Sequence, residues 1–200
     1  MLAEAEGIYR KDRRTELYLK QARLRYNVSI QEVSCSPQRG LTMEQWIVLC
    51  ECSFIENHTN LLILGPTGVG KSHIASALAR QACGKGYKTI YHNMNRLVEE
   101  IKAAKLSGTY LKLLDQIAKT PLLILDDFGL KNIDNEVRIA LYEILEDRTG
   151  KGSIVVTSQL PIASWYDKFG DPTLAEACLD RLTGNAVKIN IKGESWRTKT

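Results

Sequence analysis

The sequence lacks long apolar segments. No run of consecutive apolar residues approaches the ~20 that a helix needs to cross a bilayer. The first residues, MLAEAE, also lack the basic and then apolar layout of a signal peptide. We therefore expect no membrane association. With 200 residues, 44% of them hydrophobic and 25% charged, the chain has the composition of one well-buried globular domain.

The sequence lacks cysteines at the spacings of a disulfide or metal framework. The five cysteines are an odd number, they include no C-x-x-C pair, and none has a histidine partner at metal-ligand spacing. This pattern disfavours both a disulfide scaffold and a structural zinc site. A reducing, cytoplasmic location fits the composition best.

The chain also lacks a large excess of charge, since its formal net charge is only +4. Residues 10–25 nevertheless hold seven basic side chains against two acidic ones. The seven are Arg10, Lys11, Arg13, Arg14, Lys20, Arg23 and Arg25. This segment either contacts DNA or forms a solvated or intersubunit helix, and the sequence leaves both interpretations open.

The chain divides into a first segment and a main domain. We expect residues 1–40 to form a basic helical segment and a linker, because a Ser/Cys/Pro/Gln stretch at residues 34–38 is typical of a turn. Residues 41–200 form the main domain. Thr42 and Gln45 have the spacing of a capping box, which predicts a helix start there.

Short apolar runs alternate with helical patterns in the main domain, and no internal repeat interrupts them. Four or five apolar residues without polar alternation indicate strands that are buried on both faces. Such strands between amphipathic helices predict a parallel α/β sheet. The runs are residues 61–64, 89–91, 122–125, 154–156 and a weaker 187–191.

The first apolar run leads directly into the sequence GPTGVGKS and then into a helical pattern. This is the G-x-x-x-x-G-K-[ST] phosphate loop in its expected strand-to-helix context. Glycines let the backbone amides surround phosphates, Lys71 reaches the β- and γ-phosphates, and the Ser72 hydroxyl is a Mg²⁺ ligand. We therefore expect a nucleotide site formed by Gly65, Pro66, Thr67, Gly68, Val69, Gly70, Lys71, Ser72 and His73. The alternative is a glycine-rich turn with an unrelated lysine.

Two acids follow the third apolar run. A buried strand that ends in Asp126 and Asp127 places both carboxylates at the carboxyl edge of the sheet, beside the phosphate loop. We expect Asp126 to hold Mg²⁺ through water and Asp127 to orient or deprotonate the attacking water. The alternative is a pair of capping acids at a strand-to-turn junction.

Two further residues have the chemistry for this site. Gln159 follows the fourth strand and can sense the γ-phosphate or position water, although a Ser/Gln loop before Pro161 is the alternative. Arg181 lies in a helical pattern, where a single arginine is usually solvated or salt-bridged. Its interpretation depends on the family.

These motifs together resemble the AAA+ ATPases, and most closely the IstB-like transposition helpers, relatives of the DnaC and DnaI helicase loaders. The resemblance covers residues 2–197, nearly the whole chain. Seven segments carry it: residues 60–72, 122–129, 143–148, 157–161, 170–175, 179–182 and 193–197. The phosphate loop in the first segment is generic, whereas the last four segments are distinctive of the family.

The resemblance implies a P-loop AAA+ fold, three αβα layers with a parallel sheet, without the C-terminal helical lid and with a short basic helical N-terminal segment. It places Asp126 and Asp127 at Walker B, Gln159 at sensor 1, and Arg181 at the arginine finger that acts on ATP of a neighbouring subunit. The Asp-Asp pair departs from the Asp-Glu of many AAA+ proteins. The family also has some tens of residues ahead of the segment that matches Met1, so we expect an N-terminal truncation.

The resemblance further implies an ATP- and Mg²⁺-dependent homo-oligomer, joined through its ATP sites, that bends duplex DNA and recruits the transposase of the same element. Candidate DNA contacts lie between the second and third strands, with a solvated helix face as the alternative. They are Lys102, Lys105, Ser107, Thr109, Tyr110 and Lys112. Arg197 can contact the nucleotide or the next subunit.

Three other functions remain open from the sequence. A helicase loader acting in DNA replication would prefer single-stranded DNA. A small-molecule kinase begins with the same phosphate loop, but it would leave Gln159 and Arg181 unexplained. The third is an inert remnant of a mobile element that binds ATP without assembling.

Overall fold

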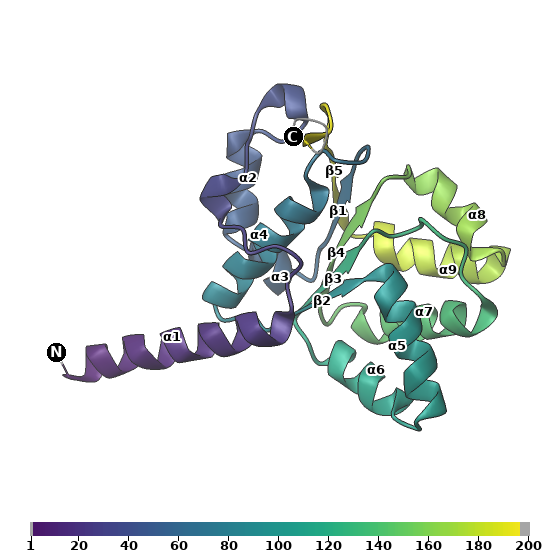
Figure 1. The fold of residues 1–200 in the computed structure, drawn as a ribbon, viewed down its shortest axis with the longest axis horizontal. Coiled ribbons are helices and arrows are strands. Elements are labelled where there is room, and N and C mark those ends of the chain that lie inside the picture. The colour runs from purple at the N-terminus through teal and green to yellow at the C-terminus, as the bar shows by residue number, and fades with distance from the viewer. Residues whose placement is uncertain (1, 197–200) are drawn as a thin grey trace.

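Five parallel strands form one sheet in the order β2-β3-β4-β1-β5 (Figure 1). The computed structural model describes residues 2–196. All five predicted strands are confirmed, with ends that differ from the prediction by one or two residues. They are β1 (Asn60–Leu64), β2 (Thr89–Asn93), β3 (Leu122–Asp126), β4 (Ser153–Ser158) and β5 (Ala186–Asn190).

Helices cover both faces of the sheet, which gives the expected three layers (Figure 1). One face carries α2 (Met43–Cys50), α3 (Ser53–Glu56) and α4 (Lys71–Gly84). The other face carries α5 (Met94–Leu106), α6 (Tyr110–Ala118), α7 (Asn135–Arg148), α8 (Trp165–Phe169) and α9 (Pro172–Thr183).

Side chains of β1 alternate between the two cores. Leu61 and Ile63 pack in the core under α2 and α4, whereas Leu62 and Leu64 pack in the core under α5 and α7. Successive side chains of a strand point to opposite faces. Because both faces are buried, the strand needs apolar residues at every position, as the sequence has.

The first helix, α1 (Leu2–Ala22), extends away from the rest of the molecule (Figure 1). Only its C-terminal end packs against α4 and β2. Short 3-10 helices follow at Ile30–Glu32 and Pro37–Arg39, and the core under α4 buries Leu41. A domain boundary near residue 40 stays a prediction.

The capping box predicted at the start of α2 is confirmed. The Gln45 amide donates to Thr42 Oγ1 at 3.2 Å, and the Thr42 amide donates to Gln45 Oε1 at 3.0 Å. At the other end of the chain, no α-helix follows β5 within residues 2–196. Over the same residues, none of the helices combines the length and apolar character required to cross a membrane.

Arg148, at the end of α7, is a buried cation that forms no ion pair with an acidic side chain of residues 2–196. Its side chain is 1% exposed and donates to the carbonyl oxygens of Ile117, Thr120, Pro121 and Ser153 at 2.6–3.2 Å. Burial lowers the pKa of Arg148 to about 10. The guanidinium therefore ties α6, the turn before β3 and the start of β4 together through backbone acceptors.

Replacing Arg148 by Met should lower the free energy of unfolding by about 3 kcal/mol, because buried carbonyl oxygens lose their donors. Urea denaturation followed by circular dichroism measures this loss. Lys151→Met, which changes an exposed cation three residues away, is the matched control and should stay within about 0.5 kcal/mol of the wild type. Equal stabilities of the two variants would contradict the role of Arg148.

Candidate functional site

The phosphate-loop sequence forms a tight turn between β1 and α4. Gly68 and Gly70 have φ angles of +84° and +94°, which residues with a side chain rarely adopt. Gly70 stands at the N-cap of α4, where no side chain caps the helix. Unpaired amides and the helix dipole make such a terminus attractive to anions. Lys71 is only 6% exposed, and its ammonium donates to the Pro66 carbonyl at 2.8 Å.

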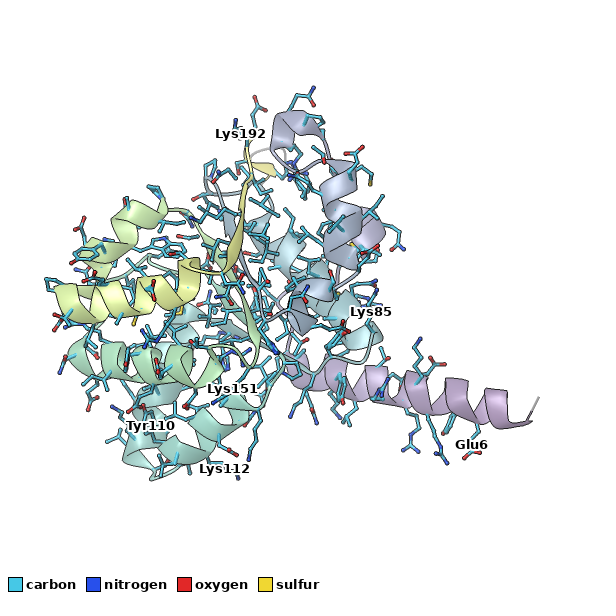
Figure 2. All side chains as sticks on the ribbon, turned by 180° about the vertical axis from the view of Figure 1, so that it is seen from behind. Glu6, Lys85, Tyr110, Lys112, Lys151 and Lys192 are labelled. Carbon is cyan, nitrogen blue, oxygen red and sulfur yellow. The ribbon has the colours of Figure 1, made fainter. Side chains whose placement is uncertain are left out.

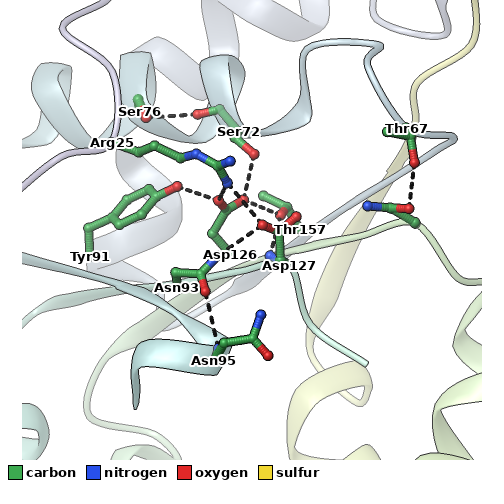
Figure 3. A network of polar contacts seen from close by, with 11 residues as sticks. Arg25, Thr67, Ser72, Ser76, Tyr91, Asn93, Asn95, Asp126, Asp127 and Thr157 are labelled. Carbon is green, nitrogen blue, oxygen red and sulfur yellow. Dashed lines mark hydrogen bonds and ion pairs between the residues drawn. The ribbon is translucent and has the colours of Figure 1, made fainter. Parts of the chain in front are cut away.

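Asp126, the last residue of β3, is a fully buried carboxylate at the centre of a polar network (Figure 3). Its Oδ1 accepts from Ser72 Oγ at 2.7 Å and from Thr157 Oγ1 at 2.5 Å. Its Oδ2 accepts from the Tyr91 hydroxyl at 2.5 Å and from Arg25 Nη1 at 2.8 Å. Burial by itself raises the pKa of this carboxyl, but the hydrogen bonds, that of Thr157 first, bring the pKa below its usual value.

Ser72 and Asp126 are far apart in the sequence but lie side by side in the fold. Strand β3 ends at the same edge of the sheet as β1, which leads into the phosphate loop. A serine hydroxyl and a carboxylate at 2.7 Å form a pair of oxygen donors of the kind that Mg²⁺ prefers. The two residues expected to serve the metal are thus in direct contact.

Asp127 lies beside this pair with an unusual backbone. Its φ angle is +62°, and its amide donates to Thr157 Oγ1 at 3.1 Å. The carboxylate accepts from Asn93 Nδ2 and from Arg25 Nη1, both at 2.9 Å. The side chain is 20% exposed, so it is accessible to solvent whereas that of Asp126 is not.

Arg25 is a site residue that the sequence analysis missed. The sequence places it in a basic segment expected to contact DNA or to form a solvated or intersubunit helix. Its guanidinium instead bridges Asp126 and Asp127 (Figure 3). The residue follows α1 in a loop, and no local motif marks it, since its partners lie 101 and 102 positions away. The next residue, Tyr26, stacks on His73 with ring centroids 4.0 Å apart.

Gln159 reaches the phosphate loop from β4, because Thr67 Oγ1 donates to its Oε1 at 2.5 Å. The amide therefore lies at the carboxyl edge of the sheet with the two acids. Arg181 does not join them. The Asn60 side chain, at the opposite end of β1, donates its Nδ2 to the Arg181 carbonyl at 3.0 Å. The guanidinium pairs with Glu146 and stacks on Tyr142.

The candidate DNA contacts lie on α5, on α6 and in the turn between them. Two of them contact acidic side chains of the chain, because Lys102 pairs with Asp134 at 2.6 Å and the Tyr110 hydroxyl donates to Glu143. Lys105 stacks on the Tyr110 ring, the Ser107 and Thr109 hydroxyls contact each other at 2.9 Å, and Lys112 is exposed on α6 (Figure 2).

The helix ends on both sides of this turn expose apolar side chains that the sequence analysis did not single out. Leu106 is 91% exposed and Leu111 is 77% exposed. At the end of the described chain, Ser195 and Trp196 lie against the phosphate loop, which was not expected either. Arg197 is outside the described residues.

Replacing Arg25 by Met should lower the free energy of unfolding by about 1–2 kcal/mol in metal-free buffer, because two neighbouring carboxylates lose their shared cationic donor. Added Mg²⁺ should restore part of the lost free energy of unfolding. Chemical denaturation with and without Mg²⁺ measures both effects. Arg23→Met removes an exposed arginine two residues away and should have little effect. A variant at Arg25 as stable as the wild type would show that the bridge does not stabilise the site.

The chain is similar to known proteins over its whole length. A family model described as "IstB-like ATP binding protein" matches residues 1–200. The "Putative insertion sequence ATP-binding protein y4pL" of Sinorhizobium fredii is 40% identical over 98% of this chain and 80% of that protein. The "Insertion sequence IS21 putative ATP-binding protein" of Pseudomonas aeruginosa is 35% identical over 100% of this chain and 75% of that protein.

Solved structures support the fold. The structure described as "Crystal structure of the DnaC helicase loader" has a TM-score of 0.67 and 19% sequence identity, and the match covers 84% of this chain and 98% of that chain. Identity at this level shows the fold alone, which is the P-loop AAA+ fold that the resemblance implied. The family model and the 40% identical relative show that the chain belongs to the IstB-like ATP-binding family.

Proposed function

We propose that this protein binds and hydrolyses ATP with Mg²⁺, assembles with further copies through its ATP sites on duplex DNA, and assists a transposase encoded by the same element in the cytoplasm. The contact between Ser72 Oγ and Asp126 Oδ1 at 2.7 Å carries the proposal. It joins the phosphate loop to the strand-end acid, as a metal–nucleotide site requires.

The residues present fit both ATP and Mg²⁺. The glycines of the loop and the uncapped start of α4 suit phosphates, and Lys71 supplies a buried ammonium for the β- and γ-phosphates. Ser72 and Asp126 would hold Mg²⁺, directly and through water, and the ion would neutralise charge on the phosphates.

The other residues of this edge act on water and on the terminal phosphate. Asp127 has a partly exposed carboxylate that can orient the attacking water or accept its proton. Gln159, which already contacts Thr67 of the loop, can donate its amide to the γ-phosphate or to that water. His73 packs on Tyr26 and supports the first turn of α4.

Arg181 acts on a different copy of the chain. Strand β1 separates its backbone from the phosphate loop, and four residue steps of about 3.3 Å correspond to about 13 Å along the strand. An arginine at the amino edge cannot serve the ATP bound at the carboxyl edge of the same sheet, but it can face the ATP of a neighbouring subunit. A trans arginine contributes about 10³–10⁵ in rate.

Mixing two inactive variants tests this arrangement. Lys71→Ala removes the phosphate contact but keeps Arg181, and Arg181→Ala keeps the phosphate loop. Each alone should lose about 10³-fold in ATP turnover. Their mixture should recover a measurable fraction, because mixed assemblies pair an intact loop with an intact arginine. Phosphate release at increasing protein concentration measures the recovery.

The control for this mixture is Arg96→Ala, an exposed arginine on α5, which should turn over ATP like the wild type. Turnover by Arg181→Ala that equals the wild type, or a mixture no more active than its components, would contradict the trans arrangement.

The proposed DNA surface comprises Lys105 and Lys112 with the turn between α5 and α6. Lysines bind phosphates without reading sequence, so binding should be salt-dependent and tolerant of sequence. The exposed Leu106 and Leu111 beside them add apolar contact area at the same place.

Replacing Lys105 and Lys112 together by Ala should weaken duplex binding and reduce the slope of log K against log salt by about 2, since each phosphate contact contributes about 0.9. Fluorescence anisotropy of a labelled duplex at several salt concentrations gives the slope. The Lys85→Ala/Lys88→Ala pair removes the same charge from the turn between α4 and β2 and should leave the slope unchanged. An unchanged slope in the first pair would contradict the surface.

The transposase partner rests on the family and on its named relatives. Proteins that match 98–100% of this chain are described as insertion sequence ATP-binding proteins. The alternative, a DnaC-like helicase loader in DNA replication, is supported only by similarity of fold. ATP turnover stimulated by single-stranded DNA alone, and not by duplex, would favour that alternative.

A further inference from the structure

The segment after β5 is attached to the phosphate loop along its length. The Ile191 amide donates to the Leu64 carbonyl at 2.7 Å, where β1 ends. Five residues later, the Trp196 amide donates to the Gly68 carbonyl at 3.1 Å, in the middle of the loop. Residues 191–196 therefore run beside residues 64–68.

Glycines make this close approach possible. A Cβ atom on Gly65 would lie 2.2 Å from the Ile191 carbonyl oxygen, and a Cβ atom on Gly68 would lie 2.0 Å from Ser195 Oγ. Contacts this short do not occur for real Cβ atoms, so neither position accepts a side chain without movement. Two glycines of the phosphate loop thus also accommodate the segment after β5.

Arg39 fixes the aromatic side chain at the end of this segment. Its Nη1 donates to the Ser34 carbonyl at 2.9 Å and its Nη2 donates to the Val69 carbonyl at 2.7 Å. The guanidinium, held by these two bonds, lies 4.5 Å from the ring centroid of Trp196. The Lys192 amide adds a bond to the Arg39 carbonyl at 2.8 Å.

Trp196 differs from the other two tryptophans. Trp46 and Trp165 are 4% and 0% exposed and belong to the two cores, whereas Trp196 is 47% exposed. Its backbone is bonded to the loop, and Arg39 supports its ring. An indole that is held in place and still half-exposed offers a surface on which a flat ring can stack.

The order of the strands gives the direction of a bound nucleotide. Asp126 ends β3, which lies on one side of β1, and Trp196 follows β5, which lies on the other side. A nucleotide whose terminal phosphate and metal face Asp126 therefore directs its nucleoside toward β5. The described residues at that side of the loop include Arg39 and Trp196.

We propose that Trp196 stacks on the purine base of the bound nucleotide and that Arg39 is the positioning residue for its indole. The inference rests on the proposed ATP site and names its base-binding wall. Arg39 itself is engaged with two carbonyl oxygens and the indole face, so its role is to hold the ring.

The test compares ATP with inorganic tripolyphosphate, which has the phosphates but no base. Trp196→Ala in the full chain should bind ATP about tenfold more weakly, since loss of one stacked base is of this size, and should bind tripolyphosphate as the wild type does. Trp196→Phe should retain most of the ATP affinity. Titration calorimetry measures both ligands. Tyr9→Ala is the matched control, because Tyr9 is an exposed aromatic residue beside Arg13 on α1.

Three results would overturn the proposal, and they are distinguishable. Unchanged ATP affinity in Trp196→Ala would show that no base rests on the indole. An equal loss for ATP and tripolyphosphate would show that the segment only supports the loop. A wild-type protein that binds neither ligand would contradict the proposed ATP site and, with it, the base-binding wall.

Discussion

The buried carboxylate of Asp126 is the constraint on which the site depends. A charge removed from water is stable only when hydrogen bonds replace its hydration. Here the donors come from β2, from the loop after α1, from α4 and from β4. Four separate parts of the chain therefore meet at one group. Any cation or phosphate that changes the environment of this carboxylate acts on all four at once.

In the proposed mechanism, one chain cannot complete its own ATP site, because the candidate residues lie at opposite edges of the sheet. The acids and the phosphate loop lie at the carboxyl edge of the sheet, whereas Arg181 lies at the amino edge, paired with Glu146. Strands cannot bring opposite edges of one rigid sheet together. A site that uses both edges must be completed by a second copy, so ATP binding and assembly would be coupled.

Local patterns predicted the fold because the strands are buried on both faces and the phosphate loop is a contiguous motif. The position of Asp126 beside the phosphate loop also followed, since parallel strands end at a common edge. Arg25 and Trp196 could not be predicted in the same way. Arg25 reaches its partners from a loop 101 residues away, and Trp196 reaches Gly68 through backbone contacts that leave no periodic signal. Such contacts arise only when the chain has folded.

Calorimetric titration of ATP into the wild-type protein, with Mg²⁺ and then with a chelator, tests the central claim most directly. The account expects saturable binding at one site per chain that is strengthened by Mg²⁺, because Ser72 and Asp126 would hold the ion beside the phosphates. It expects the Mg²⁺ effect to disappear in Asp126→Ala. Binding that is the same with and without Mg²⁺, or the absence of ATP binding, would contradict it.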